Sequence, residues 1–250
     1  MPGIYVEHVL QGIEELNQRA LAGELEMTAV SLHAYAYCAD RYVLLTTGAS
    51  VGEGVGPVVV AREAMEPRDL GGCVVAVPGH LTTASLLLQL AVGRVEMKVM
   101  PFDRILEEVV QGRVRAGILI HEGQLTYPQH GLKKVLDLGQ WWKDRTGLPA
   151  PLGVNVLRRD LGTDRIRQVA LIFKQSLDYA LAHRAEALRY AMRYGRGLDE
   201  GSTDRFVAMY VNRWALDCRP DGARAMGLLL DEATEAKLIP RRVMLEFALS

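Results

Sequence analysis

A histidine at the end of an apolar strand is the residue best placed for chemistry in this sequence. Residues 116–120 read Ala-Gly-Ile-Leu-Ile, and His121-Glu122-Gly123-Gln124 follows at once. In open α/β sheets the carboxyl ends of strands face the ligand crevice, and an imidazole titrates near neutral pH. We therefore predict that His121 is a catalytic proton acceptor. A lone histidine is more often structural, so this interpretation depends on its surroundings.

The residues around His121 do not form a zinc motif. Leu125 occupies the position where a His-Glu-x-x-His motif would need its second histidine. The three cysteines, Cys38, Cys73 and Cys218, lie far apart and form no Cys-x-x-Cys pair, which argues against a zinc site and a disulfide framework. We therefore predict that His121 acts without a zinc ion.

A helix that opens with two threonines is the second candidate site. The predicted strand 74–77 runs into Pro78-Gly79-His80, and Thr82 and Thr83 open an apolar helix. Free backbone N–H groups, hydroxyls and the positive end of a helix dipole suit a bound carboxylate. The alternative is an ordinary N-cap, which explains one threonine but not both. Both interpretations remain open from the sequence.

Two serines lie beside predicted strands. Ser31 ends the strand 27–31, with His33 close behind, and both can reach the same cleft. Ser50 lies in Gly48–Gly52, which matches the Gly-x-Ser-x-Gly string of serine hydrolases. A hydrolase needs a helix after that serine, and the glycines and proline of residues 52–57 cannot form one. We interpret this stretch as a glycine-rich connection between strands and keep a hydrolase as a lesser alternative.

A regular alternation of strands and helices from residue 73 onward positions these candidates. It predicts βαβ units, and hence a parallel sheet. The predicted strands are 27–31, 42–47, 57–61, 74–77, 96–100, 116–120 and 134–138. The predicted helices are 9–21, 83–91, 103–111, 139–146, 165–183, 185–193, 202–214 and 222–236, with a helical turn over 35–40.

The segments on either side of the βαβ block are too short to be separate domains. Residues 147–151, Gly-Leu-Pro-Ala-Pro, look like a hinge at the end of the block. We predict an α/β protein with two lobes, an outer lobe from residues 1–63 and 151–250 and an inserted small lobe from 64–150. A ligand would bind in the cleft between the lobes.

The composition is typical of a globular protein. The chain has 250 residues, of which 49% are hydrophobic and 24% charged, and its formal net charge is -1. No basic stripe is present for a phosphate backbone, so we expect no nucleic-acid partner. The sequence has neither a secretion signal nor an apolar run of about 18 residues. We expect a cytoplasmic protein without a membrane partner.

Several segments carry a resemblance to a known family, over nearly the whole chain. They are residues 14–17 (Glu-Glu-Leu-Asn), 31–37 (Ser-Leu-His-Ala-Tyr-Ala-Tyr), 54–57 (Gly-Val-Gly-Pro), 76–84 (with Ala-Val-Pro-Gly and Thr-Thr-Ala), 120–127 (Ile-His-Glu-Gly-Gln-Leu-Thr-Tyr) and 148–153 (Leu-Pro-Ala-Pro-Leu-Gly). Together they resemble the 1,4-dihydroxy-6-naphthoate synthases of the futalosine route to menaquinone. The motif that begins at His121 is highly specific.

The resemblance implies a fold like that of type 2 periplasmic binding proteins, used as a cytoplasmic enzyme. It implies a lyase that cleaves cyclic dehypoxanthinyl futalosine, an aryl carboxylate, to 1,4-dihydroxy-6-naphthoate without a metal or redox cofactor. His121 corresponds to the proposed proton acceptor, and Ser31, Thr82, Thr83 and Ile120 correspond to positions lining the substrate pocket. The alternatives are a sister enzyme like chorismate dehydratase and a non-catalytic protein that binds a small carboxylate.

The first residues depart from the family pattern. Family members begin with a strand and a loop of the type Ser-Pro-Cys-Pro-Asn-Asp-Thr-Phe, whereas residues 3–6 here align with the second strand. We expect the chain as given to lack about 25 to 30 residues, the usual size of one strand–helix unit. Its activity would then depend on the missing loop, which forms one wall of the cleft.

Overall fold

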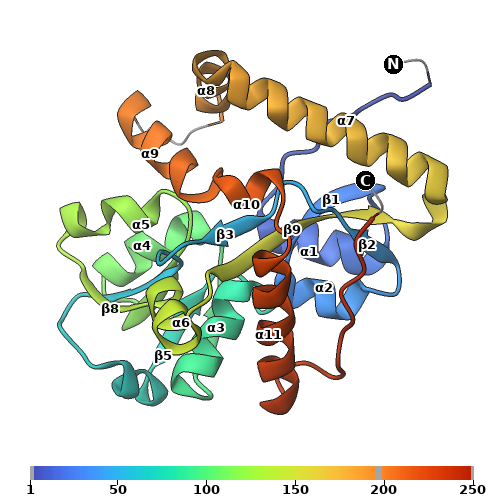
Figure 1. Ribbon diagram of the computed structural model, residues 1–250. Coiled ribbons are helices and arrows are strands. Elements are labelled where there is room, and N and C mark those ends of the chain that lie inside the picture. Colours follow the sequence, from blue (N-terminus) through green and yellow to red (C-terminus); the bar gives the residue numbers. More distant parts are fainter. Residues whose placement is uncertain (1–2, 195–198, 249–250) are drawn as a thin grey trace.

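The computed structural model describes residues 3–194 and 199–248 and arranges them around two β-sheets (Figure 1). The first sheet has the order β1-β9-β2, and β3 also pairs with β9. The second has the order β6-β5-β7-β4-β8. The strands are β1 (Met27–Ser31), β2 (Tyr42–Leu44), β3 (Ser50–Gly52), β4 (Val58–Ala61), β5 (Val74–Val77), β6 (Glu96–Val99), β7 (Ala116–Leu119), β8 (Lys133–Asp137) and β9 (Ala150–Arg158).

Helices cover both sheets. They are α1 (Ile13–Ala22), α2 (Leu32–Cys38), α3 (Thr83–Val92), α4 (Phe102–Val110), α5 (Gly123–Thr126), α6 (Leu138–Thr146), α7 (Thr163–Ala182), α8 (Arg184–Met192), α9 (Glu200–Tyr210), α10 (Arg213–Leu216) and α11 (Asp221–Glu235). The long helix α7 lies along one end of the molecule, and α11 packs against β9, α2 and α3 (Figure 1). Among the described residues, no helix is both long enough and apolar enough to cross a membrane.

Strand β9 organises the first sheet, because β1, β2 and β3 all pair with it in antiparallel fashion. The sequence predicts a hinge over residues 147–151 and no strand after it. This is wrong for the second half of that segment, since β9 already begins at Ala150. The buried alternation of Val154 and Val156 is a strand pattern, and the prolines at its start conceal it.

The second sheet confirms the predicted parallel arrangement for three strands. β5 pairs in parallel with β6 and with β7. β4 is the one strand of this sheet that runs the other way, and it lies between β7 and β8 and pairs with both in antiparallel fashion. The predicted lobe boundary placed β4 in the outer lobe, whereas its pairing places it in the second sheet. A boundary drawn from strand pairing lies between Gly52 and Val58, and the division into lobes itself stays a prediction.

Two predicted helices have different bounds in the structure. The helix predicted over 9–21 begins only at Ile13, because Val9 and Leu10 are 38% and 57% exposed and have little to pack against. The helix predicted over 202–214 is two helices, α9 and α10. Asn212 separates them, and its side chain accepts the backbone N–H of Trp214 at 3.0 Å as the N-cap of α10.

The two crossings between the sheets lie close together. Pairing of β3 with β9 ends at Gly52 and Ala150, and Gly56 in the first crossing packs on Gly139 of α6. A β-carbon on Gly56 would lie 2.6 Å from the backbone nitrogen of Gly139, which is closer than real β-carbons approach. Both positions therefore need glycine, and this contact fixes the crossing against α6.

One hydrophobic cluster joins the sheets. It contains Val30 and Val154 of the first sheet, Val59 and Ile118 of the second, and Trp142 of α6, all of them buried. The two sheets therefore share their main core, and each also packs a smaller cluster of its own, around Val60 and Ile105 for the second sheet and around Val43 and Leu157 for the first.

Candidate active site

His121 lies where β7 ends, and its backbone is left-handed, with φ 57°. This conformation costs a residue other than glycine roughly 1–2 kcal/mol. Strained backbone of this kind persists where the surrounding structure enforces it, and it gathers at functional sites. Glu122 follows at the N-cap position of α5 but makes no side-chain capping hydrogen bond. The expected strand-to-histidine arrangement is confirmed.

Two phenylalanines flank the half-buried His121 ring. The ring centroid of Phe102, the first residue of α4, lies 4.6 Å away, and that of Phe206 in α9 lies 6.2 Å away. Both rings are tilted relative to the imidazole. His121 therefore has apolar walls from two elements that are distant in the sequence.

Parallel strands bring the candidate groups to one edge of the second sheet. β6, β5 and β7 are neighbours and run in the same direction, so their carboxyl ends share that edge. Phe102 follows β6, the loop to Thr82 follows β5, and His121 follows β7. This edge is where ligands bind in open α/β sheets.

Thr82 is the N-cap of α3. Its Oγ1 accepts the backbone N–H of Ser85 at 3.3 Å and donates to the carbonyl oxygen of Gly79 at 2.9 Å. The interpretation of Thr82 as an ordinary cap is therefore confirmed for this hydroxyl.

Thr83 connects three elements. Its hydroxyl donates to the carbonyl oxygen of Leu152 in β9 at 2.6 Å and accepts the backbone N–H of His33 in α2 at 3.3 Å. The hydroxyl protons of Thr82 and Thr83 are thus both donated to backbone carbonyls. A carboxylate at this helix opening would bind to backbone N–H groups, not to these hydroxyls.

Ser31 is held by a buried residue that the sequence reasoning missed. The Oδ1 atom of Asn17 in α1 accepts the backbone N–H of Ser31 at 2.8 Å, and its Nδ2 donates to Ser31 Oγ at 3.2 Å. Since Ser31 Oγ is an acceptor here, its own proton remains available for an acceptor such as a carboxylate. The sequence signal was a polar residue within the apolar stripe formed by Ile13, Ala20 and Leu21.

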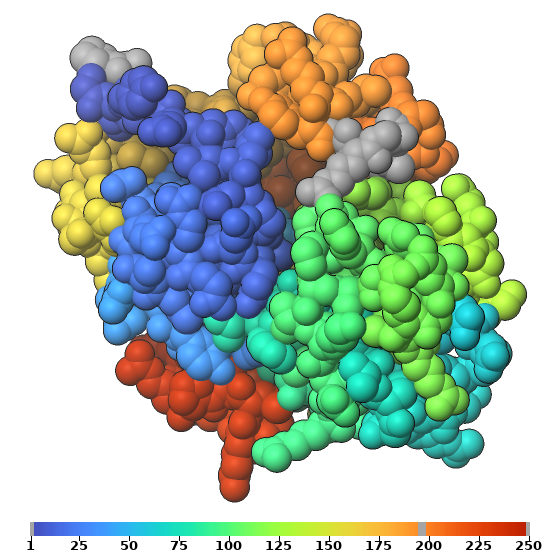
Figure 2. Space-filling view, turned by 180° about the vertical axis from the view of Figure 1, so that it is seen from behind, coloured from blue at the N-terminus to red at the C-terminus, as the bar shows by residue number. Residues whose placement is uncertain are grey.

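The start of α1 faces the edge described above. A β-carbon on Gly12 would lie 3.9 Å from the Phe102 ring, and the carboxylate of Glu14 contacts Gly79. Figure 2 shows a hollow on this face, between the blue segment that contains α1 and the green segment around α4 and α5. Ser31, which Asn17 of α1 holds, therefore lies on the side of the first sheet, whereas the opening of α3 follows β5, the direct neighbour of β7, on the same sheet edge as His121.

His33 does not face the cleft. It is buried, its Nδ1 lies 3.3 Å from the carbonyl oxygen of Thr82, and its ring packs 5.8 Å from that of Tyr37. Burial lowers the pKa of this imidazole. The expectation that it reaches the substrate is wrong.

Ser50 is not a nucleophile on a sharp turn. It opens β3 and pairs with Gly153 of β9, as expected for a connection between strands.

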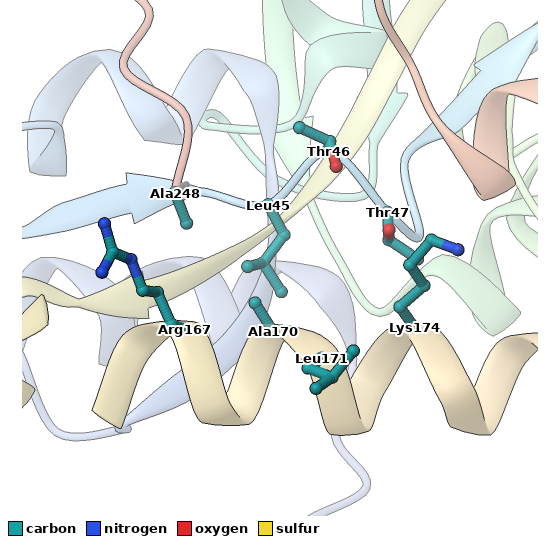
Figure 3. A pocket seen from close by; sticks show the side chains of 8 residues that line it. All are labelled: Leu45, Thr46, Thr47, Arg167, Ala170, Leu171, Lys174 and Ala248. Carbon is teal, nitrogen blue, oxygen red and sulfur yellow. The ribbon is translucent and has the colours of Figure 1, made fainter. Parts of the chain in front are cut away.

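A groove away from His121 lies between residues 45–47 and α7. It has a volume of about 190 Å³ and carries Arg167 and Lys174 on its rim (Figure 3). Ligand pockets usually enclose about 300 Å³ or more, so we assign no substrate to it. In residues 3–194 and 199–248, no group of three His, Cys, Asp or Glu side chains is arranged to hold a metal ion.

The fold defines the class of protein. The alkanesulfonate-binding protein SsuA from Xanthomonas axonopodis pv. citri is 15% identical and superposes with a TM-score of 0.66, over 94% of this chain and 83% of that one. The predicted two-lobed fold of the periplasmic-binding-protein type is confirmed.

The sequence then defines the family. The family model described as menaquinone biosynthesis matches residues 1–235. A 1,4-dihydroxy-6-naphthoate synthase from Thermus thermophilus is 48% identical over 91% of this chain and 83% of its own length. A protein of known structure from Archaeoglobus fulgidus is 46% identical with a TM-score of 0.89, over 93% of this chain and 87% of that one. The chain belongs to this menaquinone-biosynthesis family, as the resemblance implied.

Proposed function

We propose that this chain is a cytoplasmic carbon–carbon lyase that converts cyclic dehypoxanthinyl futalosine to 1,4-dihydroxy-6-naphthoate. Family membership carries the proposal, because the synthase from Thermus thermophilus matches 91% of the chain at 48% identity. The position of His121 at the ligand-binding edge of the sheet supports a base in the cleft.

His121 is the proposed proton acceptor. It removes a proton from a substrate carbon, and the electron pair of that C–H bond enters the ring. The bond to the sugar-derived fragment breaks, and the fragment leaves with the electron pair of that bond and takes up a proton. The product ring becomes aromatic, which supplies much of the driving force. The Phe102 and Phe206 rings beside the imidazole exclude water from this step.

The opening of α3, together with Ser31, is the proposed carboxylate site. Backbone N–H groups at the opening of α3, beyond Thr82, lie at the positive end of the helix dipole. The Ser31 hydroxyl has a proton to donate, because Asn17 occupies its oxygen as an acceptor. Thr83 acts by fixing this opening to β9, and Ile120, which is partly buried beside His121, provides an apolar surface for the substrate ring.

Absorbance spectroscopy with the cyclic substrate tests the function. The spectrum of the naphthoate should grow with turnover, and His121→Gln should lower the turnover number by about 10²–10⁴-fold, the usual contribution of a general base. The matched control is His130→Gln, which changes an exposed histidine and should leave turnover unchanged.

The possible results separate the alternatives. Wild-type turnover in His121→Gln would show that the base is assigned wrongly. A spectral change that stops at one equivalent of protein would indicate a binding protein. Conversion of chorismate in place of the cyclic substrate would indicate the sister enzyme.

A further inference from the structure

Gln124 is a buried side chain on α5, three residues after His121. Its hydrogen-bond network fixes the orientation of the amide. In the orientation that satisfies all neighbours, the amide nitrogen donates to the carbonyl oxygen of Gly56 at 2.7 Å, and the amide oxygen accepts the backbone N–H of His121 at 3.1 Å. The Tyr210 hydroxyl lies 2.7 Å from that nitrogen and 3.1 Å from that oxygen.

Three distant segments therefore meet at one amide. Gly56 belongs to the first crossing between the sheets, His121 carries the proposed base, and Tyr210 ends α9. The same face of α9 carries Phe206, whose ring lies 5.5 Å from that of Tyr210 and 6.2 Å from that of His121. The Gln124 contacts thus reach both the backbone and the ring surroundings of His121.

We propose that Gln124 and Tyr210 are positioning residues that hold His121 in its left-handed conformation and aim its imidazole into the cleft. The proposal rests on the proposed function of His121 as the base. His121 comes two residues after Leu119, the last residue of β7. The Gln124 oxygen accepts its backbone N–H and so ties the turn at His121 to α5.

The Tyr210 hydroxyl is suited to complete the network. Burial raises the pKa of Tyr210 to about 12, so the hydroxyl keeps its proton at neutral pH. It can then donate to the Gln124 oxygen or accept from the nitrogen. A single amide is thereby held from two sides, by Gly56 and by Tyr210.

The test separates positioning from general folding by measuring kcat and KM of three variants with the cyclic substrate. Gln124→Met keeps the shape and removes both polar groups, and it should lower kcat about 10- to 100-fold with KM within about twofold, as expected for a displaced catalytic group. Gln124→Glu keeps an oxygen for the His121 N–H and should recover part of kcat. Tyr210→Phe should give a smaller loss.

The double variant Gln124→Met/Tyr210→Phe tests whether the residues act as one unit. Members of one network are not additive, so its kcat should be close to that of Gln124→Met alone. The matched control is Tyr190→Phe on α8, whose exposed hydroxyl lies near Tyr194 and should not affect kcat.

Several results would overturn the proposal. The proposal is wrong if Gln124→Met has the kcat of wild type, or if its loss of activity lies wholly in KM. It is also wrong if the losses of kcat in the two single variants multiply in the double variant. If Gln124→Met does not fold, equal kcat values for Gln124→Glu and wild type, with no loss in Tyr210→Phe, would contradict it. Failure of the wild-type chain to form naphthoate would instead contradict the proposed function.

Discussion

At the scale of single residues, His33 is an imidazole buried between α2 and the opening of α3. Among the described residues, none gives its buried Nε2 a hydrogen bond of ordinary geometry. Burial lowers the pKa of the ring, and the carbonyl groups of Thr82 and Leu238 oppose this only in part. The folded protein therefore keeps His33 neutral at pH values where the unfolded chain already binds a proton.

This imidazole should make the protein sensitive to acid. Between the lowered pKa of the folded state and the unperturbed value of about 6.5, the unfolded chain binds more protons, so stability falls as pH decreases below about 6.5. The loss is about 1.4 kcal/mol for each unit by which the pKa is lowered. Urea unfolding at a series of pH values measures it, and His33→Phe should flatten the slope. An unchanged slope in His33→Phe would contradict this, and His130→Gln serves as the control.

A candidate site residue can be predicted from the sequence when the residues next to it in the chain indicate its position. His121 was predictable because a wholly apolar strand leads straight into it. Gln124 was not, because its partners Gly56 and Tyr210 are distant in sequence and meet it only in the folded chain. Asn17 lies between these cases, as a polar residue in an apolar stripe.

At the scale of elements, the contact between the first crossing and α6 is made by backbone alone. Gly56 and Gly139 approach so closely that neither position has space for a β-carbon. Gly56 also accepts the Gln124 amide, so this contact lies directly behind the proposed positioning network.

Gly139→Ala should therefore destabilise the protein by about 1–3 kcal/mol, the usual cost of overpacking. The matched control is Gly227→Ala in α11, where a β-carbon meets nothing within 4 Å. There alanine should stabilise the helix by about 0.5–1 kcal/mol. Urea denaturation of both variants measures the difference. Equal free energies of unfolding for Gly139→Ala and wild type would show that the crossing is not tightly packed.

Helices and strands could be predicted where the pattern of apolar residues is uninterrupted. The strand 74–77 has the predicted bounds, because four apolar residues stand between loop residues. β9 was missed because Pro151 interrupts its signal, although its pairing partners leave room for the proline. The break between α9 and α10 depends on the Asn212 cap, which the helical spacing of apolar residues does not indicate.

At the scale of the whole molecule, the main hydrophobic cluster is shared by the two sheets, with a smaller cluster beside each. Helices α3, α6 and α11 contribute to it alongside both sheets. A two-lobed outline is therefore compatible with one shared interior. The lobes were predicted from the short segments on either side of the βαβ block. The pairing of β4 could not be predicted, because its run of valines is the same whether the strand pairs in parallel or antiparallel fashion.

A shared interior predicts a single unfolding transition. Trp142 in α6 and Trp214 in α10 are both buried in this cluster. Far-ultraviolet circular dichroism and tryptophan fluorescence should give coincident midpoints in urea. The variant Trp214→Phe, which leaves Trp141 and Trp142 as reporters, should keep the two probes coincident. Two separate midpoints would show that the lobes unfold independently.

The left-handed backbone at His121 has a consequence for evolution and for engineering. Glycine adopts this conformation without the penalty that histidine carries, so selection for stability alone would favour glycine at position 121. On the proposed function, the imidazole is kept at this position for its role as the base. Protein engineering that accepts every stabilising substitution would therefore give a more stable protein without the proposed base. Position 121 should be held fixed in such work.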